Sequence, residues 1–232
     1  MSDATATTVG VTTPLKGIRR TAARRMVAAW GAPVFHLTIE VDMTEASKIR
    51  QIVPEATVTD VLVAAAAQAL RSVPALNSHV GDEEVTVFNE ANVGIAVATE
   101  KGLTVPVIHR ADHLTVPEIA ARRRDVVERA RTGALTRDDI TGGTFTISNL
   151  GMMGIDRFDA ILNIPQSAIL AVGATKKRHV WNEAGGEWLP IAEFTLTCDH
   201  RSVDGATGAI FLKAFSDAVT TPITVYRPLP PG

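Results

Sequence analysis

The stretch Asp199-His200-Arg201-Ser202-Val203-Asp204-Gly205 joins a predicted strand to a predicted helix. The residues before it alternate between apolar and polar side chains, which predicts a strand with one buried face. The residues after it, towards Phe215, favour a helix. We therefore expect His200 where a buried strand meets a turn, a position that can hold a base rigidly beside a cleft. The alternation consists of apolar Phe194, Leu196 and Cys198 and polar Thr195, Thr197 and Asp199.

The amino-acid composition narrows the classes of protein to which the chain can belong. The chain has 232 residues, of which 46% are hydrophobic and 21% charged, and this profile favours one compact domain with an ample core. A net charge of −2 gives no reason to expect nucleic acid as a partner. The longest apolar run, residues 61–67, is too short to span a bilayer. The single cysteine, Cys198, excludes an intrachain disulfide and fits a reducing compartment.

The first residues lack the basic and apolar regions of a signal peptide. We therefore expect a cytoplasmic protein with a disordered arm over residues 1–13 and one domain over residues 14–232.

Strand and helix patterns are mixed along the rest of the chain. Residues 35–43 alternate regularly, and residues 167–174 are almost wholly apolar, which predicts a strand buried on both faces. Thr44, Thr59 and Thr115 are the expected N-caps of three helices. Because there is no strict βαβ rhythm, the pattern predicts a mixed-sheet α/β or α+β domain.

Most motifs for other chemistries are absent from the sequence. There is no phosphate-binding Gly-x-x-x-x-Gly-Lys-Ser/Thr, no dinucleotide-binding Gly-x-Gly-x-x-Gly after a strand, and no Gly-x-Ser-x-Gly nucleophile elbow. No second histidine or cysteine lies at a metal-ligand spacing from His200, so we expect no metal. A lone histidine on a turn is more often structural than catalytic. The remaining functional interpretation is a histidine that acts directly as a general base.

Several segments together resemble one known family. His200, Asp204 and Gly205 resemble the His-x-x-x-Asp-Gly signature of acyltransferases related to chloramphenicol acetyltransferase. The resemblance is closer to the catalytic domain of the dihydrolipoamide acyltransferases, the core subunits of 2-oxoacid dehydrogenase complexes. It covers residues 14–221 and includes the segments 17–26, 94–107, 143–151 and 166–173. It implies a two-layer sandwich in which helices flank a mixed β-sheet.

The resemblance also implies a role for each site residue. His200 would take the proton from an attacking thiol or hydroxyl, and Ser148 would donate a hydrogen bond to the tetrahedral oxyanion. Asp204 would shape the catalytic loop by pairing with Arg19 or Arg20 of the first helix, and the two arginines remain alternatives. The family's active sites lie between the subunits of a trimer, with His200 from one chain and Ser148 from its neighbour. Coenzyme A or its acetyl thioester is the implied substrate.

The sequence departs from the family at several places. It has no Asp-Lys-Ala lipoylation motif, so we expect no lipoyl group on this chain, and its proline-rich end predicts an assembly that stops at the trimer. Val34-Phe35-His36 and Asn163-Ile164-Pro165-Gln166 also differ from the usual pattern. These departures favour a free-standing acyltransferase that moves an acetyl group from acetyl-CoA to a small-molecule hydroxyl. The resemblance to stand-alone relatives of the family implies a role in natural-product biosynthesis, for example in the O-acetylation of polyketide tetronates.

Two alternatives remain open. One is the dihydrolipoamide acyltransferase core of a 2-oxoacid dehydrogenase complex. The other is a trimeric scaffold without activity, although such a scaffold has no need of His200, Ser148 and Asp204 together. For the free-standing acyltransferase, direct transfer in a ternary complex is expected, since Cys198 lies on the predicted buried strand and no base is assigned to it.

Overall fold

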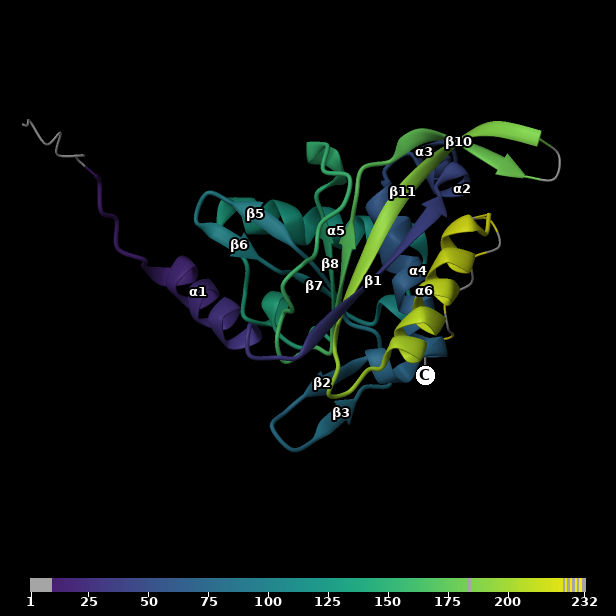
Figure 1. Ribbon diagram of the computed structural model, residues 1–232. Coiled ribbons are helices and arrows are strands. Elements are labelled where there is room, and N and C mark those ends of the chain that lie inside the picture. Colours follow the sequence, from purple (N-terminus) through teal and green to yellow (C-terminus); the bar gives the residue numbers. More distant parts are fainter. Residues whose placement is uncertain are drawn as a thin grey trace, which may run out of the picture.

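A mixed β-sheet forms the centre of the molecule (Figure 1). The computed structural model describes residues 10–182 and 185–222, and also 224, 226, 228 and 230. Within these residues, β4–β8 and β8–β9 are parallel and the other pairs of the sheet are antiparallel. The strands, in spatial order, are β1 (Val34–Asp42), β11 (Gly185–Asp199), β9 (Ala168–Val172), β8 (Phe145–Asn149), β4 (Val93–Ile95) and β7 (Val107–Ile108), and β10 (Lys176–Asn182) pairs with β11.

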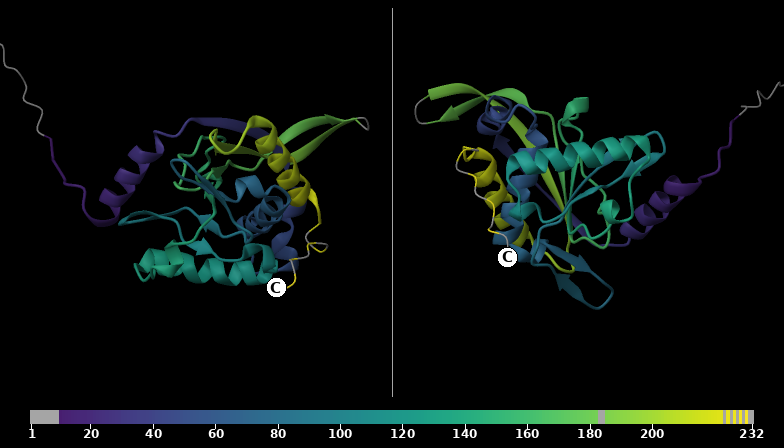
Figure 2. Two further views of the ribbon diagram at one scale, coloured as in Figure 1. Left: turned by 90° about the horizontal axis from the view of Figure 1, so that it is seen from below. Right: turned by 180° about the vertical axis from the view of Figure 1, so that it is seen from behind.

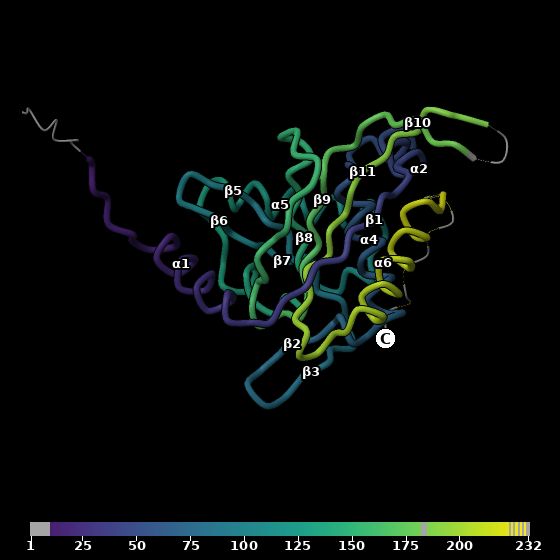
Figure 3. Tube along the Cα trace, in the orientation of Figure 1, coloured from purple at the N-terminus to yellow at the C-terminus, as the bar shows by residue number. Residues whose placement is uncertain are grey.

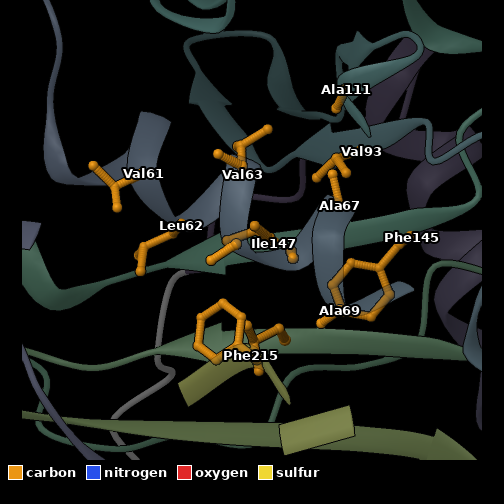
Figure 4. Close-up of a cluster of buried hydrophobic side chains, with 14 of the residues drawn as sticks. Val61, Leu62, Val63, Ala67, Ala69, Val93, Ala111, Phe145, Ile147 and Phe215 are labelled. Carbon is orange, nitrogen blue, oxygen red and sulfur yellow. The ribbon is translucent and has the colours of Figure 1, made fainter. Parts of the chain in front are cut away.

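Three long helices cover one face of this sheet (Figure 2). They are α4 (Val58–Ser72), α5 (Val116–Thr132) and α6 (Gly205–Thr220). The core between helices and sheet is built from α4 side chains such as Leu62, from Phe145 and Ile147 of β8, and from Phe215 of α6 (Figure 4). The run of small residues in α4 allows the helix to lie close to the sheet. The predicted two-layer α/β sandwich with a mixed sheet is thereby confirmed.

The opposite face of the sheet is covered by chain without regular structure. Residues 158–164 contribute apolar side chains that pack on Ile169 and Ala171 of β9 and on Ala29 of the first helix. That helix, α1 (Gly17–Ala29), extends away from the body of the molecule (Figure 3). The hairpin of β10 and β11 projects at the other end. The protomer therefore has a compact centre and two projecting elements.

The remaining elements are short. They are the helices α2 (Thr44–Ser47) and α3 (Ile49–Ile52), the hairpins β2 (Ser78–Val80) with β3 (Val85–Val87) and β5 (Val97–Thr99) with β6 (Gly102–Thr104), and the 3-10 turns η1 (Pro74–Leu76), η2 (Ala111–His113), η3 (Asp138–Ile140) and η4 (Gly151–Met153).

The three predicted N-caps had different outcomes. Thr115 begins α5 with a complete capping box, as predicted. Thr59 was the wrong cap for α4, because Thr57 and Asp60 form the capping box two residues earlier. Thr44 was also wrong: it is the first residue of α2, and its backbone N–H and hydroxyl both donate to Asp42.

The domain limits predicted from the sequence stay a prediction. Residues 1–9 of the expected arm lie outside the described residues, and residues 10–13 are exposed and belong to no helix or strand. Near the other end, Tyr226 packs against the core, and its hydroxyl donates to the carbonyl oxygen of Leu114. In the part of the chain that the structure describes, no helix is both long and apolar enough to cross a membrane.

Candidate active site

The turn after β11 is held by a buried carboxylate. Asp199 is almost fully buried and accepts hydrogen bonds from both the backbone and the guanidinium of Arg201. Its own backbone N–H donates to the carbonyl oxygen of Ser167, which ties the turn to the start of β9. Since charge-assisted bidentate pairs have a fixed geometry, they hold the backbone on both sides of His200.

His200 is exposed on this rigid turn. Its backbone N–H donates to the carbonyl oxygen of Pro33 at 2.9 Å, and its imidazole lies 4.8 Å from the ring of Phe35, measured between centroids. Among the described residues, no hydrogen bond to either ring nitrogen is present. The ring is thus positioned by packing while its nitrogens remain available to a substrate. The contact with Phe35 was not anticipated from the sequence, because it joins strands whose pairing is nonlocal.

Asp204 caps helix α6. Its carboxylate accepts the backbone N–H of Thr207 at 2.8 Å, and this bond, with smaller contributions that include the charge of His200, holds the pKa of the carboxyl below its usual range. The predicted pair with Arg19 or Arg20 does not form inside the protomer. The Arg19 guanidinium donates to the carbonyl oxygen of Glu100, and that of Arg20 donates to the carbonyl oxygen of Leu15. Because α1 projects away from the turn in this chain (Figure 1), the pairing stays a prediction.

Ser148 lies on β8, far from His200 in the same chain. It is half-buried, and no described residue makes a hydrogen bond to its hydroxyl. The sheet register places Ser148 beside Ala171, which in turn lies beside Thr195. His200 follows five residues later on a strand two positions away, so the two Cα atoms are on the order of 19 Å apart. One chain therefore presents two separated half-sites.

The face of the sheet that carries Ser148 is polar near β1. The ring of His36 shares a 2.9 Å hydrogen bond with the hydroxyl of Thr197, and the hydroxyls of Thr38 and Thr195 lie 3.0 Å apart. The regular alternation of residues 35–43 indicated this polar face, but it did not indicate which strand would supply the partners.

Cys198 is not placed to act as a nucleophile. It is fully buried under α6, and burial raises the pKa of its thiol to about 12, so the thiolate is negligible at neutral pH. Within the described ranges, no cluster of three or more histidine, cysteine, aspartate or glutamate side chains has the arrangement of a metal site. Of the predicted site residues, His200 and Ser148 keep an imidazole and a hydroxyl to which no described residue makes a hydrogen bond.

Comparison with known proteins identifies related chains. The sequence model of the catalytic domain of 2-oxoacid dehydrogenase acyltransferases matches residues 8–226. The acetyltransferase component of the pyruvate dehydrogenase complex of Rickettsia bellii is 36% identical over 219 residues, which are 90% of this chain and 52% of that protein. The chain thus spans about half the length of the curated relatives it matches.

Two solved structures place the fold. The dihydrolipoamide acetyltransferase of Azotobacter vinelandii superposes with a TM-score of 0.88 at 28% identity, and the match covers 97% of this chain and 98% of that one. A serine, a histidine and an asparagine of that enzyme have been investigated for their role in its catalytic mechanism. The histidine follows the serine by 52 residues, and the asparagine follows the histidine by four. A chloramphenicol acetyltransferase, 15% identical, shares the fold with a TM-score of 0.58 over 85% of this chain and 94% of that one. By the extent of these matches, the chain belongs to the family of 2-oxoacid dehydrogenase acyltransferases and corresponds to their catalytic domain.

Proposed function

We propose that the protein is an acyltransferase that moves an acetyl group between coenzyme A and the thiol of dihydrolipoamide. The observation that carries the proposal is the spacing of the two half-sites. His200 follows Ser148 by 52 residues and precedes Asp204 by four, which are the spacings of the residues addressed in the Azotobacter acetyltransferase. Asp204 stands where that relative has asparagine, and both side chains can cap a helix.

In the proposed reaction, His200 acts as the general base. It removes the proton from the dihydrolipoamide thiol, and the thiolate attacks the carbonyl carbon of acetyl-CoA. The hydroxyl of Ser148 donates to the resulting oxyanion. When the intermediate collapses, the C–S bond to coenzyme A breaks and the imidazolium returns the proton to the departing thiolate. The products are free coenzyme A and S-acetyldihydrolipoamide, and no acyl group is attached to the enzyme.

The separation of His200 from Ser148 supports a site that is shared between chains. A hydrogen bond reaches about 3 Å, so one protomer cannot place both groups on the same carbonyl. A ring of copies related by a rotation axis would bring the His200 of one chain to the Ser148 of the next. We propose a trimer of this kind, in keeping with the family.

Relatives in pyruvate dehydrogenase complexes favour the thiol acceptor over the small-molecule hydroxyl expected from the sequence departures. One observation keeps the hydroxyl acceptor as a second candidate: His36, one of the departures, lies on the polar face of the sheet with its Nδ1 bonded to Thr197. An added imidazole on that face would suit a more polar acceptor than a lipoyl arm.

The test is an acetyl-transfer assay with purified protein. With acetyl-CoA and dihydrolipoamide, we expect coenzyme A to be released in step with formation of the acetyl thioester, and His200→Ala to lower the rate of both by about 10²–10⁴-fold. Transfer to hydroxyl compounds but not to dihydrolipoamide would support the second candidate. No turnover with any acceptor, together with equal binding of acetyl-CoA by wild type and His200→Ala, would support an inactive scaffold.

A further inference from the structure

Two consecutive methionines are exposed on the turn that follows the strand of Ser148. Met152 and Met153 lie in η4, four and five residues after the serine, and their side chains are 82% and 73% exposed. Ile155, two residues after Met153 in the chain, is 42% exposed. We call these three residues the methionine patch. Contiguous exposed apolar side chains next to a site are typical of a surface that contacts an apolar part of a ligand, and flexible, polarisable methionine adapts well to it.

The turn that carries the methionine patch is rigid. Asn149 accepts the backbone N–H of Gly151, and Leu150 accepts that of Met153. Gly151 packs directly on the backbone of Gly173, where an added Cβ would overlap the carbonyl oxygen. Gly154 closes the turn with a φ of 80°, a conformation that favours glycine. The methionines are therefore held in the open by a fixed backbone.

A hollow continues from the methionine patch along the sheet. It has a volume of about 510 Å³ and is lined by Gly154, Ile155, Asp156, Arg157 and Glu193. Glu193 lies on β11 two residues before Thr195, and the register places Thr195 in the row of Ser148. The hollow therefore begins roughly 7 Å beyond that row, on the same face of the sheet. Its walls are polar, with the Glu193 carboxylate paired to Arg178 and 3.8 Å from Arg157.

We propose that Met152 and Met153 bind the hydrocarbon chain of the lipoyl arm and thereby determine specificity for it. This inference rests on the proposed function and names the part of the site that recognises the thiol substrate. The lipoyl arm is an unbroken run of methylenes between its thiols and its amide. With the thiol at Ser148, the methylenes would lie over the methionine patch, and the amide would reach the polar hollow. The pantetheine arm of coenzyme A is interrupted by amides and matches an apolar surface less well.

The experiment compares the double variant Met152→Ser/Met153→Ser with wild type. We expect KM for dihydrolipoamide to rise roughly tenfold, because each methylene in an apolar pocket is worth about 10-fold or more in discrimination, with kcat within about twofold. KM for acetyl-CoA and the rate with 2-mercaptoethanol, a thiol without the chain, stay unchanged. Met152→Leu/Met153→Leu keeps the apolar surface and behaves as wild type. Ile210→Ser is the matched control, since Ile210 is 60% exposed on the outer side of α6.

Each contrary result has a distinct meaning. If wild type is active and the double variant has the same KM for dihydrolipoamide, the inference is overturned and the proposed function is not. If KM rises equally for dihydrolipoamide and for acetyl-CoA, the methionine patch binds the pantetheine arm, which also overturns the inference. A smaller assembly of the double variant in light scattering would show a subunit contact instead, which also contradicts the inference. A wild type that acetylates other acceptors but not dihydrolipoamide overturns the proposed function, and the inference with it.

Discussion

The two ends of the central sheet hold their chemical groups by different means. At the end of β11, side-chain bonds hold the turn around His200: Arg201 clamps the buried Asp199, and Asp204 caps α6. At the end of β8, close backbone packing holds the turn after Ser148, where Gly151 lies against Gly173. The turn around His200 is therefore charged and exposed, whereas the turn after Ser148 exposes apolar side chains. In the proposed mechanism the two half-sites have different tasks, with proton transfer at His200 and binding of the oxyanion at Ser148.

The largest effect is expected from removing the base. His200→Ala should lower kcat by about 10²–10⁴-fold, because the substitution removes the proposed general base. Single-turnover acetyl transfer would measure this, with circular dichroism to confirm that the fold is kept. If the variant retains more than a tenth of the wild-type rate, His200 is not the general base.

The next effect is at the other half-site. Ser148→Ala should lower kcat by roughly 10²–10³-fold, the cost of one oxyanion donor, while KM changes little. The small substitution leaves the half-buried strand intact, so the melting temperature should match that of wild type. If KM rises and kcat stays constant, Ser148 binds the substrate in the ground state rather than the oxyanion. The proposed division of tasks between the His200 turn and the Ser148 turn would then be wrong.

Backbone packing at the second half-site can be broken directly. A Cβ at Gly173 would overlap the carbonyl group of Asp156, so Gly173→Ala should destabilise the protein by about 1–3 kcal/mol. The loss should appear in urea unfolding. Gly205→Ala is a suitable control, since a Cβ there meets nothing within 4 Å. Equal stability of the two variants would contradict the close approach between the backbones of Gly173 and Asp156.

The smallest effect concerns the cap at the first half-site. Asp204→Ala removes the acceptor of the Thr207 N–H and should lower the melting temperature by a few degrees, whereas Asp204→Asn should keep the cap. Because the pKa of Asp204 is lowered in the fold, its contribution is present above the ordinary carboxyl pKa and is lost as the pH falls through the folded value. The difference between wild type and Asp204→Ala should therefore shrink in acid, as calorimetry would show.

Sequence reasoning succeeded where the determinants are local. The alternation of residues 35–43 predicted β1, and the proline-containing capping box at Thr115 predicted the start of α5. It misplaced the cap of α4, because Thr57 and Thr59 both offer a hydroxyl and only the partner Asp60 decides between them.

The site was harder to predict, because its geometry is nonlocal. Family resemblance supplied His200 and Ser148 as candidates, but their separation follows from the sheet register. The position of α1, and with it the partners of Arg19 and Arg20, depends on the contacts of this helix with β6 rather than on its own sequence. Exposure of Met152 and Met153 likewise cannot be read from their types, because methionine is usually buried.

The central claim is that each chain carries two half-sites that are completed only by a neighbour. It is tested most directly by mixing two inactive variants, His200→Ala and Ser148→Ala, through unfolding and refolding or co-expression. In a closed ring of randomly mixed chains, about a quarter of the interfaces join an intact His200 to an intact Ser148, so we predict about a quarter of wild-type activity. Activity in the mixture no higher than in either variant alone would contradict the claim.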